Sequence, residues 1–378
     1  MLPWINRALE ALWLLAAFLV PLAFVSQEYV ISEAEISYVE VPKVALLRAV
    51  AALMAILWGG EWAIRSHALQ RAFPWITADT LRSKTRPSNI FANLKNWLKV
   101  HPTRWLVLAA GLFFGSTLLS TVLSGSPTTS IWGEIPGQDG YSAYTVASYF
   151  VLFGVIATHL KTKAQLGRLL GALVLMGSLV GFYGILQHYG HDFLKLTEAT
   201  GGGSSRVTIF MGNTIFAGAV LSMTVPVTLM VAALTLRREY WSDWAPLEKL
   251  DDWQRESAVT IVWSLVLAVQ LLGLMFTFSR GPWGGTVLAL GAFLFLVLLS
   301  FGWRMLIQAG LVLGLAGILA LALLQTMGNV SILGAGAWIG IALALAGVTG
   351  TCTTLFIIKR FGRATIYLAM AGAVVVIA

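Results

Sequence analysis

Eleven stretches of this chain are apolar enough to be considered as membrane-spanning helices. A helix needs about 20 mostly apolar residues to cross the hydrocarbon core of a bilayer. The stretches lie at 8–26, 44–64, 105–123, 142–160, 169–187, 214–235, 259–278, 282–301, 305–325, 336–358 and 364–378. The last is short and ends with the sequence at Ala378, so we expect the chain to be the front part of a longer protein. The pattern predicts an all-α polytopic membrane protein.

Composition excludes the main alternatives. Hydrophobic residues make up 58% of the chain and charged residues 11%, whereas a soluble domain is about half apolar and a quarter charged. The single cysteine, Cys352, excludes a disulfide framework and a thiolate cluster. The five histidines form no HExxH or HxxxH motif, so no metal or other cofactor is expected. The basic residues lie between apolar runs rather than on a soluble face, which argues against a nucleic-acid partner.

The distribution of Lys and Arg predicts the orientation. Cytoplasmic loops carry the excess of basic residues. With the N-terminus in the cytoplasm, all but five of the 25 basic residues fall on the inner side. The five on the outer side are Lys43, Arg48, Lys195, Arg206 and Arg280. We therefore expect a single transmembrane domain over residues 1–378, in the cytoplasmic membrane, with its N-terminus inside.

Three connecting segments are long. The 65–104 segment mixes tryptophan and other apolar residues with basic ones, which suits either a cytoplasmic interfacial segment on an anionic leaflet or a plain connector. Segment 236–258 carries both signs of charge and predicts a short amphipathic helix in a cytoplasmic loop. Segment 187–213 contains the flexible GGGSS stretch and forms an outer loop.

Two outer arginines point to a phosphorylated ligand. Arg280 lies in the tight turn FSRGP between two spans, beside the start of a helix whose dipole favours anions. Arg206 precedes an apolar segment that leads back into the membrane, and Asn213 lies at the start of the helix that follows. An arginine can also simply extend to the interface, but guanidinium is the side chain best suited to bidentate phosphate recognition. The pair predicts a site for a lipid-linked phosphate or diphosphate.

Four segments resemble those of the O-antigen ligase and polymerase superfamily. RVTIFMGNTIFAG at 206–218 resembles its R-x-x-G-T-F-G-N-P-N-x-x-A segment, and TFSRGPWGG at 277–285 resembles its S-R-G/S-x-W-x-G segment. FYGILQHYGHD at 182–192 and IWGEIPGQDGY at 131–141 are similar to two others. The four occur in family order and cover about residues 130 to 300.

The resemblance implies a C-type membrane glycosyltransferase fold and a metal-independent, inverting transfer. The donor would be a glycan on a polyprenyl diphosphate, and the acceptor a lipid A core, another lipid-linked glycan or a protein hydroxyl on the outer face. Arg206 and Arg280 would be the catalytic, diphosphate-binding residues, accompanied by Asn213 and Ser279. Asn213 and Trp283 would also support the architecture of the site.

The chain departs from the family in three places. Where the family carries an arginine, this chain has Glu134, Gln138 and Asp139; Thr214 and Phe216 replace a proline and an asparagine. The family's long outer loop with an acceptor-activating residue corresponds here to the short 325–335 segment, which lacks His, Asp, Glu and Arg. We expect that residue beyond Ala378. Secondary candidates on the outer side are Gln187, His188, His191, Glu134, Gln138, Asp139 and Tyr141.

Two other function classes stay open. A transporter or flippase would place ionisable residues near the middle of its spans, and no run here has one at its centre. A non-catalytic membrane subunit agrees with the composition but leaves the two outer arginines without a role.

Overall fold

The chain is almost entirely helical wherever its structure is described. The computed structural model describes residues 2–25, 39–72, 98–99, 104–133, 141–194, 206–236, 251–327 and 337–361. Within these ranges no strand occurs. Nine helices there are long and apolar enough to cross a membrane, and a tenth apolar helix, Ala143–His159, is shorter. The prediction of an all-helical, multi-pass membrane protein is confirmed at this level, whereas the number of spans and the orientation stay predictions.

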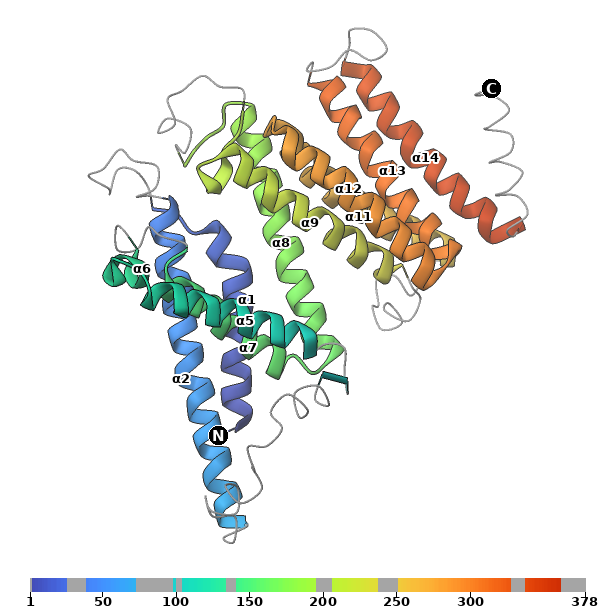
Figure 1. Cartoon of the computed structure of the whole chain (residues 1–378). Helices are drawn as coiled ribbons and strands as arrows, with labels where there is room; N and C mark the ends of the chain where they lie inside the picture. The colour runs from blue at the N-terminus through green and yellow to red at the C-terminus, as the bar shows by residue number, and fades with distance from the viewer. Residues whose placement is uncertain are drawn as a thin grey trace. The chain divides into compact units, whose positions relative to one another are not determined.

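Ten of the eleven apolar runs coincide with a helix. The helices are α1 (Leu2–Leu22), α2 (Val41–Ala72), α5 (Arg104–Val122), α6 (Pro127–Trp132), α7 (Ala143–His159), α8 (Lys163–His188), α9 (Thr214–Thr235), α11 (Asp252–Phe276), α12 (Arg280–Phe301), α13 (Trp303–Thr326) and α14 (Ala337–Phe361), with a 3₁₀ turn η5 (Ile209–Met211) (Figure 1). The run at 364–378 lies outside the described residues.

The helix ends correct two predicted loop boundaries. Helix α2 continues to Ala72, into the predicted 65–104 loop, and α11 begins at Asp252, inside the predicted 236–258 loop. Both extensions contain polar residues. A helix can extend beyond its apolar run because its backbone hydrogen bonds do not depend on the side chains being apolar. Apart from residues 98–99, 104, 236 and 251, the rest of these two loops lies outside the described residues.

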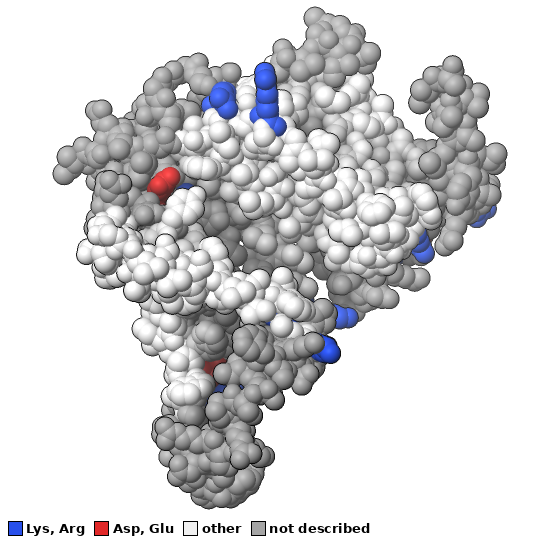
Figure 2. All heavy atoms as spheres, viewed as in Figure 1, with Lys and Arg blue, Asp and Glu red and all other residues white. Residues whose placement is uncertain are grey.

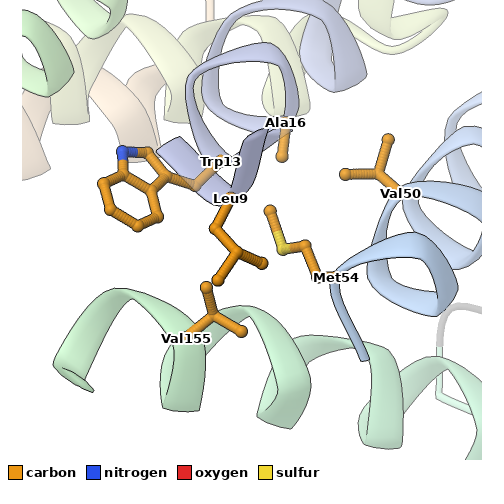
Figure 3. Close-up of a cluster of buried hydrophobic side chains, with 6 residues drawn as sticks. All are labelled: Leu9, Trp13, Ala16, Val50, Met54 and Val155. Carbon is orange, nitrogen blue, oxygen red and sulfur yellow. The ribbon is translucent and has the colours of Figure 1, made fainter. Parts of the chain in front are cut away.

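The described chain divides into two units, residues 1–169 and 170–378. In the first unit, α1, α2 and α7 enclose a small apolar core. Leu9, Trp13 and Ala16 of α1 lie on one face at helical spacing, opposite Val50 and Met54 of α2. Figure 3 shows Leu9, Met54 and Val155 of α7 pointing toward one another. This packing fixes α2 against α7.

In the second unit, α11 is the most buried helix of those that could span a membrane. It packs on α9, α13 and α14 (Figure 1). Buried Gln270 links three helices: its Nε2 donates to Ser178 Oγ of α8 at 3.2 Å, and its Oε1 accepts from Thr228 of α9 at 2.9 Å. Side-chain hydrogen bonds of this kind are common between helices in an apolar bilayer.

Helices α8 and α11 touch through their backbones. A Cβ placed on Gly273 would lie 2.6 Å from the Cα of Gly181, so neither position has room for a side chain. The close crossing brings the C-terminal ends of α8 and α11 together. On the face shown in Figure 2 the described surface is mostly uncharged, as a surface in contact with lipid should be.

Candidate functional site

The tight turn between α11 and α12 forms one wall of the candidate site. Thr277 Oγ1 and Trp283 Nε1 both donate to the carbonyl of Leu274, at 2.7 and 2.9 Å, and so satisfy the last turn of α11. Phe278 adopts a left-handed conformation with φ of 47°. After this reversal Ser279 is buried, and Arg280 begins α12 with an exposed side chain.

Arg206 joins this turn to the start of α9. Its Nε donates to the carbonyl of Thr277 at 3.2 Å, and its Nη2 donates to Ser279 Oγ at 3.3 Å and to Thr214 Oγ1 at 2.9 Å. The adjacent Val207 N–H donates to Phe276 O at 3.1 Å. The structure therefore places Arg206 against the residue that immediately precedes Arg280, although 73 residues separate Arg206 from Ser279 in the chain.

Two helices begin at this place. Asn213 caps α9 by accepting from Ile215 N at 2.8 Å, and neither α9 nor α12 has an acidic residue in its first turn. The first turns of α9 and α12 pack closely. A Cβ on Gly218 would lie only 2.7 Å from the ring of Pro282, so this position has no room for a side chain. Helix N-termini carry a partial positive charge, so the first turns of α9 and α12, together with the two arginines, favour an anion on their side of the turn.

A buried hydrogen-bond network holds the segment that carries Arg206. Gln187 Oε1, at the end of α8, accepts from the backbone N–H groups of Thr208 and Ile209 at 3.1 and 2.9 Å. Its Nε2 donates to Asp192 Oδ2 at 3.1 Å. The hydroxyl of Tyr183 donates to the other oxygen of Asp192. The network fixes residues 206–209 relative to α8, which gives Gln187 a positioning role.

Backbone strain is concentrated in the same place. Ile209 and Phe278 are the two described non-glycine residues with positive φ, at 53° and 47°. Such a conformation is unfavourable, above all for a β-branched residue, and costs about 1–3 kcal/mol unless the surroundings impose it. Here Gln187 holds Ile209, and Leu274 holds the turn at Phe278. Strained residues of this kind cluster at functional sites.

The remaining predicted residues fall into three groups. His188 stacks on Phe276, with ring centroids 3.7 Å apart and planes within 8°, whereas His191 is exposed. Tyr141 is exposed in the first unit, where it is 92% accessible. Glu134, Gln138 and Asp139 lie outside the described residues. The four residues predicted for the diphosphate site, by contrast, all lie around the two helix starts.

No metal centre is present among the described residues, since no group of three His, Cys, Asp or Glu side chains comes together there. Burial raises the pKa of the Tyr189 phenol, the neighbour of His188, above its ordinary value. Arg206, anchored by its hydrogen bonds, and the exposed Arg280 are the cationic side chains that the described part of this site offers to a ligand.

Sequence reasoning missed several polar residues. Thr214 and Asp192 support the site, and Asp192 could have been found from its place five residues after Gln187 in the 182–192 segment. In the first unit, Arg48 is buried and donates to Ser142 Oγ and Thr145 Oγ1, each at 2.8 Å. Ser142 caps α7, so Arg48 ties α2 to the beginning of α7.

Comparison with known proteins finds no matching family, no matching curated protein and no matching solved structure.

Proposed function

We propose that the protein transfers a glycan from a polyprenyl diphosphate carrier to an acceptor hydroxyl at the outer face of the cytoplasmic membrane. The observation that carries this proposal is the anchoring of Arg206 on the turn that presents Arg280, at the point where α9 and α12 begin. The acceptor is a lipid A core, another lipid-linked glycan or a protein.

The chemistry explains why such a site needs fixed cations. In an inverting transfer the acceptor oxygen bonds to the anomeric carbon as the bond from that carbon to the diphosphate oxygen breaks. The acceptor's proton leaves to a base, and the electron pair stays on the diphosphate. Preorganised donors that face the developing charge lower the barrier, and a metal ion is not required for this.

The location also suits a lipid-linked donor. Helices α9 and α12 are both long and apolar enough to span a membrane, and each begins at the arginine site. A charged group at that depth would lie near the membrane surface while a hydrocarbon chain attached to it stayed in the bilayer. Asn213 and Trp283 have structural roles in this proposal, since Asn213 caps α9 and Trp283 caps α11.

The transporter alternative has less support. Buried Glu61 and His159 are ionisable residues of α2 and α7, but Glu61 lies one turn from the end of its span and His159 is the last residue of α7. Proton and ion relays place such groups along the membrane interior. A purely structural subunit would not need two strained turns to hold an arginine in place.

Chelation provides a direct test of this chemistry. Liposomes containing the full protein, a polyprenyl diphosphate-linked oligosaccharide and candidate acceptors are assayed for release of polyprenyl diphosphate, with and without EDTA. We expect release that depends on the protein and on an acceptor, at the same rate in EDTA, because guanidinium groups stabilise the leaving group. Release that stops in EDTA and returns with Mg²⁺ would contradict the metal-independent mechanism.

A further inference from the structure

A small cavity lies in the first unit, at the ends of the spans formed by α2 and α7. It measures about 140 Å³. Trp58, Glu61, Trp62 and Arg65 contribute to its wall from α2, and His159 and Lys161 from the end of α7 and the residues after it. The predicted N-inside orientation puts this cavity at the cytoplasmic surface.

The floor of the cavity is a hydrogen-bonded network around the Glu61 carboxylate. Glu61 and His159 are 3% and 7% exposed, and His159 Nε2 lies 2.6 Å from Glu61 Oε2. The other carboxylate oxygen of Glu61 pairs with Arg65. His159 Nδ1 is 3.0 Å from the carbonyl of Val155. Because both oxygens of Glu61 already have partners, the floor is poorly suited to bind a cation from outside.

The rim of the cavity, in contrast, is cationic and aromatic. The Arg65 side chain is half exposed even though it pairs with Glu61, and Lys161 is exposed. Trp62 is 72% exposed at the same end of the span. Two cations against one carboxylate leave a positive balance, and tryptophan is enriched where spans meet the membrane surface.

We propose that this cavity binds the phosphate of an anionic phospholipid headgroup. Basic pockets between helices on the cytoplasmic side are typical sites for such headgroups. Arg65 and Lys161 donate to the phosphate, Trp62 lies against the glycerol region, and the acyl chains enter the bilayer beside α2. The proposal is independent of the glycan-transfer function.

The test uses lysine variants of the whole chain. Delipidated protein in a neutral detergent is titrated with phosphatidylglycerol or phosphatidylcholine, and bound lipid is counted by native mass spectrometry. The test variant is Lys161→Ala. Lys163→Ala is the matched control, because Lys163 is also exposed and lies two residues away but does not line the cavity. We expect phosphatidylglycerol to be retained in preference to phosphatidylcholine, with its affinity lowered about fivefold in Lys161→Ala and unchanged in Lys163→Ala.

Three results would overturn the proposal. Equal losses in the two lysine variants would indicate general surface attraction rather than a site. Equal retention of the two lipids would remove the role of headgroup charge. Displacement of phosphatidylglycerol by millimolar inorganic phosphate, lost in Lys161→Ala, would identify free phosphate as the ligand. Since the variants are read by lipid binding and not by glycan transfer, failure of one proposal leaves the other intact.

Discussion

Replacing Arg280 by alanine is expected to lower the rate of glycan transfer by about 10²–10³-fold, the usual cost of removing one fixed donor to a developing negative charge. Arg280 is exposed and makes no hydrogen bond or ion pair with another described residue. Its removal therefore costs the fold little, and the loss should appear in turnover rather than in stability. Turnover is measured in reconstituted liposomes, with the thermal unfolding midpoint recorded on the same preparation.

Two further variants test whether the loss is specific to the position and to the guanidinium group of Arg280. Arg304→Ala removes an exposed arginine beyond the far end of α12, about 33 Å from Arg280 along a helix of 22 residues, and should transfer normally. Arg280→Lys keeps the charge but loses the forked geometry and should fall between alanine and wild type. Wild-type turnover in Arg280→Ala would remove this residue from the chemistry.

Replacing Gln187 by methionine is the second change with a large expected effect. The variant keeps the side-chain length but leaves the buried N–H groups of Thr208 and Ile209 without their acceptor, at a cost of about 1–3 kcal/mol for each group. Residues 206–209 then lose their anchor to α8, and Arg206 loses its fixed position. We expect a lower unfolding midpoint and weaker donor binding, both measured on protein purified in detergent.

Gln165→Met is the matched control, because Gln165 lies in α8, as Gln187 does, and its side-chain oxygen also accepts from two backbone N–H groups. These belong to Lys161 and Thr162, at 2.9 and 3.1 Å, and they are exposed. Water can replace the lost acceptor there. The variant also loses the hydrogen bond from Gln165 Nε2 to Glu10 at 3.3 Å, which involves no residue of the arginine site, so donor binding should change little. If Gln187→Met bound the donor as tightly as Gln165→Met, the network around Gln187 would have no positioning role.

The sequence was most informative about the spans. Each apolar run up to 336–358 coincides with a described helix, because burial in lipid demands about the same length everywhere. Helix ends were less predictable. The α2 helix continues past its apolar run to Ala72. Near the end of that run, Glu61 and Arg65 form an ion pair one turn apart.

The site was predictable only in part. The predicted topology puts Arg206 and Arg280 on the same side of the membrane, and in the structure Arg206 contacts Ser279, the residue before Arg280. The contacts of Thr214 with Arg206 and of Gln187 with Thr208 and Ile209 depend on the conformation of residues 206–211, and no local pattern specifies that conformation. Likewise, Glu61 and His159 are 98 residues apart and each is an isolated polar residue near the end of an apolar run, so their pairing is visible only in three dimensions.

Binding of the donor tests the central claim most directly. A polyprenyl diphosphate-linked glycan is titrated into the detergent-purified chain as wild type, Arg206→Ala, Arg280→Ala and Arg304→Ala. We predict that the first two substitutions weaken binding at least about tenfold, as loss of charge-assisted hydrogen bonds should, while Arg304→Ala binds like wild type. Equal binding by all four proteins, or binding by none, would contradict a diphosphate site at Arg206 and Arg280.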